Sequence, residues 1–160
     1  RLHPNGKFRD VLGPVDFVLD DLEGPGETLT GLAMKHDQTL LAAMDGQIVE
    51  LVRDGSDWRE RTRWQSWGDA PDARFGASIH IASDGVNLLV ADTERHRVLL
   101  FSPDGGKPIA QFGVTDRPGD GLDALNRPSL VAIYGDRAVV YDAANQRLVK
   151  LDLASGEAHP

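Results

Sequence analysis

Short runs of apolar residues, each about as long as a β-strand, are the main pattern in this sequence. They alternate with clusters of Gly, Pro, Asp and Asn, and the clearest set covers residues 78–82, 87–91, 97–101 and 108–112. Runs of this length, separated by such turn residues, predict four antiparallel strands joined by short turns. A helical interpretation fails because Gly, Pro or Asp-Gly turns interrupt every stretch long enough to show a 3.6-residue period.

The same pattern returns about every fifty residues. Leu2 recurs as Leu51, Phe101 and Leu151, at steps of 49, 50 and 50 residues, and a Gly-containing turn follows each of them. A period of this size is typical of repeat architectures. Four antiparallel strands in each repeat predict the blade of an all-β protein, a β-propeller.

A second element fixes the phase of the repeat. Asp92 and Arg97 of one repeat recur as Asp142 and Arg147 of the next in an alignment without gaps, whereas the corresponding segment 39–49 has Ala42 and Gln47 at these two positions. The first repeat is therefore degenerate. We interpret each Asp and Arg as a structural pair that braces the hairpin between the second and third strands through charge-assisted hydrogen bonds.

These motifs resemble those of the NHL repeat family. Its blades carry a Pro before an apolar strand, a Gly turn, an apolar stretch ending in Val-Ala-Asp, and then an Arg followed by apolar residues. Residues 128–133 with Asp142 and Arg147 match this pattern, as does Val90-Ala91-Asp92, and the resemblance is clear over residues 76–153. It implies four-stranded antiparallel blades in a ring of about six. The family spans binding modules, lyases and hydrolases, so the motifs indicate the fold rather than the function.

The repeat phase divides the chain into parts of a propeller. The expected parts are the end of a preceding blade with a linker (1–26), a degenerate first blade (27–75), a second blade (76–127) and a third blade lacking its last strand (128–160). About three blades cannot close a ring of six. Either the chain is an excerpt of a longer propeller, or a second copy of the chain completes the ring.

Composition narrows the function classes. The sequence has 25 Asp plus Glu against 17 Lys plus Arg, a formal net charge of -8, and no cysteine. This charge makes nucleic acid an unlikely partner, because phosphate binding needs a positive surface. Without cysteine there is neither a disulfide framework nor a thiolate metal site. No apolar run approaches the length of a membrane span, so we expect no membrane partner. We expect the protein to be extracellular or periplasmic.

His80 is the candidate residue of the propeller channel, because it lies on an expected first strand. A lone histidine does not make a zinc site, which needs three or four converging ligands, so no metal and no cofactor are expected. In the related propeller of peptidyl-hydroxyglycine amidating lyases, a metal-binding His stands next to the Pro that opens the first strand. The matching positions here are Ala77 and Ser129, which have no imidazole.

The segment 58–67 has the most unusual composition, with three Trp and three Arg. Read as a regular outer strand, it places Arg59, Arg61 and Arg63 on one face, and Trp58 with Trp64 on the other. Such a surface could bind an anionic sugar or a nucleic-acid base. Alternatively, the charges protect an exposed edge strand while the Trp rings pack against the neighbouring blade.

The connections between blades supply the remaining ligand-binding candidates. Arg74, Asp120 and Arg127 lie in these loops, which in a propeller sit near the channel mouth. The acidic residues around Asp120 lack the ligand order of an EF-hand loop, so calcium is not expected.

Together these features favour a binding scaffold for protein or carbohydrate ligands rather than an enzyme. The alternative is part of an enzyme propeller, a lyase or hydrolase, whose channel active site is completed by other blades. The expected partners are the remaining blades of the propeller or a second copy of the chain.

Overall fold

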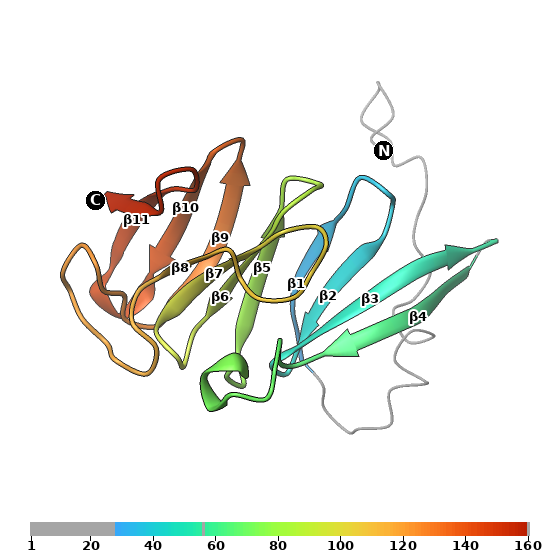
Figure 1. Cartoon of the computed structure of the whole chain (residues 1–160), viewed down its shortest axis with the longest axis horizontal. Helices are drawn as coiled ribbons and strands as arrows, with labels where there is room; N and C mark the ends of the chain where they lie inside the picture. Colours follow the sequence, from blue (N-terminus) through green and yellow to red (C-terminus); the bar gives the residue numbers. More distant parts are fainter. Residues whose placement is uncertain (1–27, 56, 160) are drawn as a thin grey trace.

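The computed structural model describes residues 28–55 and 57–159 and places them in three antiparallel sheets of four strands each, arranged side by side (Figure 1). Within each sheet the strands follow chain order. The segment 1–26, which the sequence assigns to a preceding blade and linker, lies outside the described residues. In the described part of the chain there is no helix long and apolar enough to cross a membrane.

The strands have the following bounds. The first sheet contains β1 (Leu29–Met34), β2 (Leu40–Met44), β3 (Gln47–Asp54) and β4 (Asp57–Trp64). The second contains β5 (Ile79–Ser83), β6 (Leu88–Asp92), β7 (Arg97–Phe101) and β8 (Ala110–Phe112). The third contains β9 (Pro128–Tyr134), β10 (Arg137–Asp142), β11 (Arg147–Asp152) and β12 (Glu157–His159). Two 3-10 turns, η1 (Pro71–Ala73) and η2 (Ala143–Asn145), lie in the connections.

The third sheet differs from the sequence expectation, which gave it no last strand. β12 pairs antiparallel with β11, with Lys150 opposite His159 and Asp152 opposite Glu157. The sequence signal was weak because β12 has only three residues, of which only Ala158 is apolar. The third sheet is therefore complete at four strands.

The first strands of the three sheets lie next to one another. In Figure 1, β5 stands between β1 and β9, while the later strands of each sheet fan outward. The hydroxyl of Thr30 on β1 donates a hydrogen bond to the carbonyl of Ile79 on β5, with an O···O distance of 2.5 Å. This places one edge of every sheet along a common inner line, as in a propeller.

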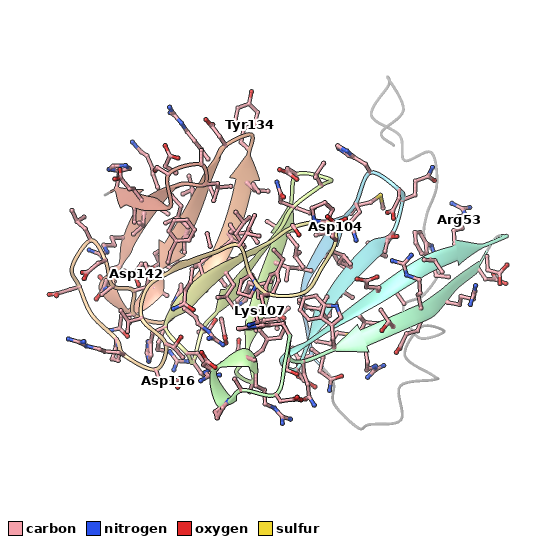
Figure 2. The ribbon with its side chains drawn as sticks, viewed as in Figure 1. Arg53, Asp104, Lys107, Asp116, Tyr134 and Asp142 are labelled. Carbon is pink, nitrogen blue, oxygen red and sulfur yellow. The ribbon has the colours of Figure 1, made fainter. Side chains whose placement is uncertain are left out.

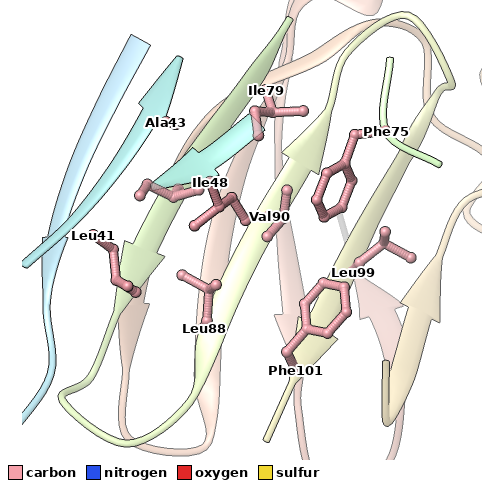
Figure 3. Close-up of a cluster of buried hydrophobic side chains, with 10 residues drawn as sticks. Leu41, Ala43, Ile48, Phe75, Ile79, Leu88, Val90, Leu99 and Phe101 are labelled. Atoms are coloured by element: carbon pink, nitrogen blue, oxygen red, sulfur yellow. The ribbon is translucent and has the colours of Figure 1, made fainter. Parts of the chain in front are cut away.

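Apolar side chains fill the space between neighbouring sheets. Leu41 and Ile48 of the first sheet pack with Val90, Leu99 and Phe101 of the second (Figure 3). The opposite face of the second sheet packs on the third through a cluster containing Leu89, Ala91, Val98, Leu100, Ala138, Val140, Val149 and Leu151. The alternation of side chains along a strand therefore gives the second sheet two buried faces.

The outer face of the third sheet is different. Leu130, Val139 and Leu148 are 66%, 39% and 64% exposed, and Tyr134 at the end of β9 is 89% exposed (Figure 2). By the fifty-residue repeat, Val139 corresponds to Leu89 and Leu148 to Val98, both of which are fully buried in the second sheet. The third sheet thus presents to solvent a face that the second sheet uses for inter-sheet packing.

The turn between β2 and β3 fits closely against the start of the second repeat. Gly46 has a φ of +72°, and a Cβ atom added there would lie 2.2 Å from the carbonyl oxygen of Gly76. Both the left-handed backbone and this close approach require glycine. The turn therefore fixes the spacing between the first and second repeats.

Candidate functional site

The Asp and Arg that recur in successive repeats form ion pairs at the same end of the second and third sheets. The Nε atom of Arg97 donates to Oδ2 of Asp92 at 2.9 Å, and Nε of Arg147 donates to Oδ2 of Asp142 at 2.8 Å. In each sheet the carboxylate ends the second strand and the guanidinium begins the third, so the residues pair across the ladder.

Each pair also holds the loop that arrives from the preceding sheet. The other guanidinium nitrogens of Arg97 donate to the carbonyls of Asp72 and Arg74, both at 2.8 Å, while Oδ1 of Asp92 accepts from the amide of Gly76 at 2.8 Å. We call this arrangement an Asp–Arg clamp. It provides hydrogen-bond partners for backbone groups that a connecting loop would otherwise have to leave to solvent.

The clamp is repeated in the third sheet. Arg147 donates to the carbonyls of Asp120, Gly121 and Ala124, at 2.5, 2.8 and 2.9 Å. The second carboxylate oxygen of Asp142 accepts from the amide of Asn126, at 2.6 Å. Asn126 lies fifty residues after Gly76, so the device follows the repeat.

Burial distinguishes the clamp of the second sheet. The side chains of Asp92 and Arg97 are 0% and 1% exposed. Burial raises the pKa of Asp92, although hydrogen bonds from Gly76 and Arg97 act in the opposite direction, and burial lowers the pKa of Arg97. The indole of Trp67 lies beneath the guanidinium, with Cζ of Arg97 5.0 Å from the ring centroid, and this contact is a cation–π interaction.

Arg95 forms a second tie between loops at this end of the molecule. Its guanidinium makes a two-point ion pair with Asp116, at 2.9 and 2.8 Å, and donates to the carbonyls of Pro71 and Arg74 at 2.9 and 2.5 Å. The hydrogen bond from Arg95 lowers the pKa of the Asp116 carboxyl. The connections before and after the second sheet are thereby linked to each other.

Three ligand-binding candidates from the inter-sheet loops, Arg74, Asp120 and Arg127, lie among these hydrogen bonds and ion pairs. Arg74 donates from Nη2 to Oε1 of Gln65 at 2.9 Å, and its own carbonyl is one of those held by Arg97. Asp120 contributes its carbonyl to the clamp of the third sheet. The backbone amide of Arg127 donates to Nδ1 of His96 at 3.1 Å. The side chain of Arg127 lies 4.0 Å from Oε1 of Glu94. All three candidates thus take part in contacts that hold the inter-sheet loops.

His80 lies on the inner edge of the second sheet. It is half-buried on β5, and its Nδ1 atom is 3.1 Å from the carbonyl oxygen of Thr30 on β1. In the described ranges, no three His, Cys, Asp or Glu side chains are grouped so that they could hold a metal ion. The contact to Thr30 instead ties the innermost strands of two sheets together.

The arginine-rich strand does not have the two faces that regular alternation predicts. Glu50 of β3 pairs with Thr62, and Leu51 pairs with Glu60, so Arg61 is an extra residue in β4, a β-bulge. A bulge reverses the alternation beyond it. Trp58 accordingly packs against the cluster of Ala42, Met44, Val49 and Leu51, whereas Trp64 packs into the cluster between the first and second sheets. The expectation that both rings share a face is wrong.

The three arginines of this strand are engaged with carboxylates. Arg59 lies 3.3 Å from Asp54, Arg61 lies 2.6 Å from Glu50, and Arg63 lies 2.8 Å from Glu60. Arg63 also lies on β4 opposite Val49, and Arg59 opposite Val52, positions on opposite faces of β3. The expected positive stripe is therefore split between two faces and largely compensated in charge.

The bulge brings Trp64 next to Trp67 in a groove between the first two sheets. This cavity, of about 260 Å³, is lined by Glu50, Trp64, Ser66, Trp67, Gly105 and Gly106. The two glycines belong to the loop that carries Asp104 and Lys107, which crosses from the second sheet toward the first (Figure 2). We call this cavity the Trp groove.

Fold and geometry together define a class: the chain has a β-propeller-like fold of three four-stranded antiparallel sheets. A scan against models of protein families finds no match, and a search of curated proteins finds none either.

Solved structures share the fold at low sequence identity. The computationally designed Ika4 protein matches with a TM-score of 0.58 and 12% identity, over 86% of this chain and 74% of its own. Glutaminyl cyclase from Myxococcus xanthus matches with a TM-score of 0.54 and 12% identity, over 82% of this chain and 51% of its own. Apo AztD from Citrobacter koseri matches with 0.51 and 17%, over 86% of this chain and 36% of its own. The chain thus spans only about half of the cyclase and about a third of AztD.

Sequence reasoning missed Trp67 and Glu50 as site residues. Trp67 follows the end of β4, and its neighbour Phe101 is thirty-four positions away in the sequence. Glu50 alternates with apolar residues on β3 and reads as an ordinary solvent-facing position. The groove could have been predicted only by knowing that the bulge in β4 turns Trp64 toward the second sheet.

Proposed function

We propose that this chain is part of an NHL-type β-propeller that serves as a binding scaffold for protein or carbohydrate ligands. The observation that supports this most directly is the repeated Asp–Arg clamp. It uses the conspicuous ionisable side chains of the repeat to hold the backbone of the inter-sheet loops by several hydrogen bonds each. Loops held in this way on a sheet framework present a preorganised surface, which lowers the entropic cost of binding.

The fold alone does not decide between binding and catalysis, since a glutaminyl cyclase shares it. A direct test is to probe the chain with a glycan array and a peptide library, then recover each captured ligand and measure its mass. Capture of an unchanged ligand supports the scaffold. Chemical conversion of the ligand supports the alternative of an enzyme propeller, and capture of neither class contradicts the proposal.

The exposed apolar face of the third sheet supports the propeller part of the proposal. Leu148 and Val139 occupy positions whose counterparts on the second sheet are buried under the next sheet. We expect a further four-stranded blade of the same type to cover them. The chain should then bind a hydrophobic dye such as ANS through this face, and Leu148→Lys should reduce the binding. If the chain binds no dye and the substitution changes nothing, the face is not a docking surface.

A further inference from the structure

We infer that the Trp groove is a binding site for one neutral sugar ring, an inference that rests on the proposed role of the chain as a binding scaffold. Four features carry it: the size of the cavity, a fixed aromatic floor, a charge-compensated polar pair at its side, and an open mouth.

The size of the groove suits a small ligand. Its volume is about 260 Å³, and an adjoining narrow space of about 40 Å³ shares Glu50, Trp64 and Gly105 with it and is lined further in by apolar residues and by Lys35. Pockets for drug-sized molecules begin at about 300 Å³. The groove therefore has room for one ring rather than for a long chain in extended form.

The aromatic floor is held in place by the protein core. The ring centroid of Trp64 lies 5.4 Å from those of Phe75 and Phe101, and the ring of Trp67 lies 5.5 and 5.6 Å from the same two rings. Both indoles are only half-buried, whereas Phe75 and Phe101 are buried. A ligand thus meets two indole rings whose orientation is already set, one of which also carries the Arg97 guanidinium on its ring, so little side-chain entropy is lost on binding.

The polar side of the groove is a carboxylate that already has a cationic partner. Oε2 of Glu50 lies 2.6 Å from Nη2 of Arg61, and the two side chains are 16% and 47% exposed. Within the groove, Glu50 offers carboxylate acceptors and Ser66 offers a hydroxyl that can donate or accept. The neighbouring hydroxyl groups of a sugar ring, which both donate and accept hydrogen bonds, need acceptors and donors placed close together.

Charge decides between ligand classes that bind aromatic pockets. Among the described residues that line the groove, Glu50 is the one charged residue, and Arg61 compensates its charge, so the groove has little net charge to attract either a cation or an anion. A neutral polyhydroxylated ring does not depend on such attraction. Its apolar C–H face packs on Trp64 and Trp67 while its hydroxyls reach Glu50 and Ser66.

The mouth of the groove is open at the glycine turn. Gly105 and Gly106 have φ values of +73° and +80°, and a Cβ atom added at either would meet no atom within 4 Å. The two glycines therefore leave open space beside this turn, at the edge of the groove that they line.

The three tryptophans provide a direct measurement. Their indole N–H signals are followed in ¹⁵N-labelled full chain during titration with methyl glycosides of glucose, mannose, galactose, fucose and N-acetylglucosamine. At least one glycoside should shift the signals of Trp64 and Trp67 with saturation at a Kd of about 1 mM, while Trp58, on the other face of the sheet, stays unchanged. Glu50→Gln should weaken the Kd about tenfold, because a hydrogen bond to a charged acceptor is lost.

The matched control is Glu60→Gln, which removes a carboxylate paired with Arg63 outside the groove and should leave the Kd unchanged. Ser66→Ala serves as a second groove variant with less effect on packing. The inference is overturned if no glycoside shifts Trp64 or Trp67 at about 10 mM, if all three tryptophans shift together without saturation, or if tetramethylammonium binds the groove and the glycosides do not. Ligands captured on the glycan array without shifts at Trp64 would leave the scaffold proposal standing and place its site elsewhere.

Discussion

The carboxylate of Asp92 lies 2.9 Å from the guanidinium of Arg97, and both side chains are almost fully excluded from solvent. The equivalent pair in the third sheet has nearly the same distance, but Arg147 is 25% exposed. One repeated device thus occurs in a buried and in a partly solvated form, and the difference allows its energetic role to be measured.

Replacing Arg97 with Met should destabilise the protein by about 3–5 kcal/mol, because Asp92 is left as an uncompensated buried carboxylate. Arg147→Met is the matched control and should cost less: Asp142 is also buried, but Asn145 would still donate a hydrogen bond to its Oδ2 atom, at 2.7 Å. Urea denaturation of both variants gives the two free energies of unfolding. The double variant Asp92→Leu with Arg97→Met should recover part of the loss. Equal losses for the two single variants would show that the hydrogen bond from Asn145 does not compensate for the lost arginine.

Gly46→Ala should cost clearly more than Gly135→Ala. Both glycines have positive φ, +72° and +59°, so both substitutions carry the left-handed penalty of about 1–2 kcal/mol. At Gly46 the new methyl group would also collide with the carbonyl of Gly76, whereas at Gly135 it would meet open space. Thermal unfolding of the two variants separates the collision from the backbone penalty. Matching melting temperatures would mean that the turn does not set the spacing between repeats.

The Arg95–Asp116 pair should contribute a stability term that depends on pH. The hydrogen bond from Arg95 lowers the pKa of Asp116 in the folded state, so its contribution is present above the unfolded pKa of about 3.9 and is lost as the pH falls through the folded pKa. Asp116 is 60% exposed, and we expect about 0.5 kcal/mol between the protein and Asp116→Asn at pH 7. This difference should disappear in acid, and in an Arg95→Gln background it should be absent at every pH.

Lysine substitutions can compare the two equivalent faces of the second and third sheets. Val98→Lys should cost more than about 4 kcal/mol, because Val98 is fully buried and the charge would have no partner. Leu148→Lys should change the stability of the isolated chain by less than about 0.5 kcal/mol. Guanidinium unfolding gives both values. A large loss for Leu148→Lys would show that the outer face already packs against part of this chain.

Much of the fold could be predicted because its signals are local. The third strand of the second repeat, Arg97–Phe101, has the predicted bounds, and the other strands of that repeat shift by one or two residues. Gly and Asp-Gly turns, together with apolar runs of strand length, determine these elements within a few neighbouring positions. The pairing of Asp92 with Arg97 follows from the same short range.

The candidate site was harder to predict because long-range contacts decide it. The bulge at Arg61 exists only in the pairing of β4 with β3, so a single strand read by alternation puts Trp58 and Trp64 on one face. The position of Trp67 depends on Phe101, which belongs to another sheet. For the same reason, three arginines that read as a positive stripe turn out to face carboxylates.

The first sheet has Ala42 and Gln47 where the second has Asp92 and Arg97, so the clamps hold the joints between sheets only from their C-terminal side. The repeat that follows each joint supplies its Asp–Arg clamp, and the first repeat has no such clamp of its own. The clamp between the first and second sheets is fully buried, whereas Arg147 in the clamp between the second and third sheets is 25% exposed. In mild denaturant, the third sheet should therefore detach before the first. The difference in burial between two otherwise equivalent clamps gives the molecule a direction of disassembly.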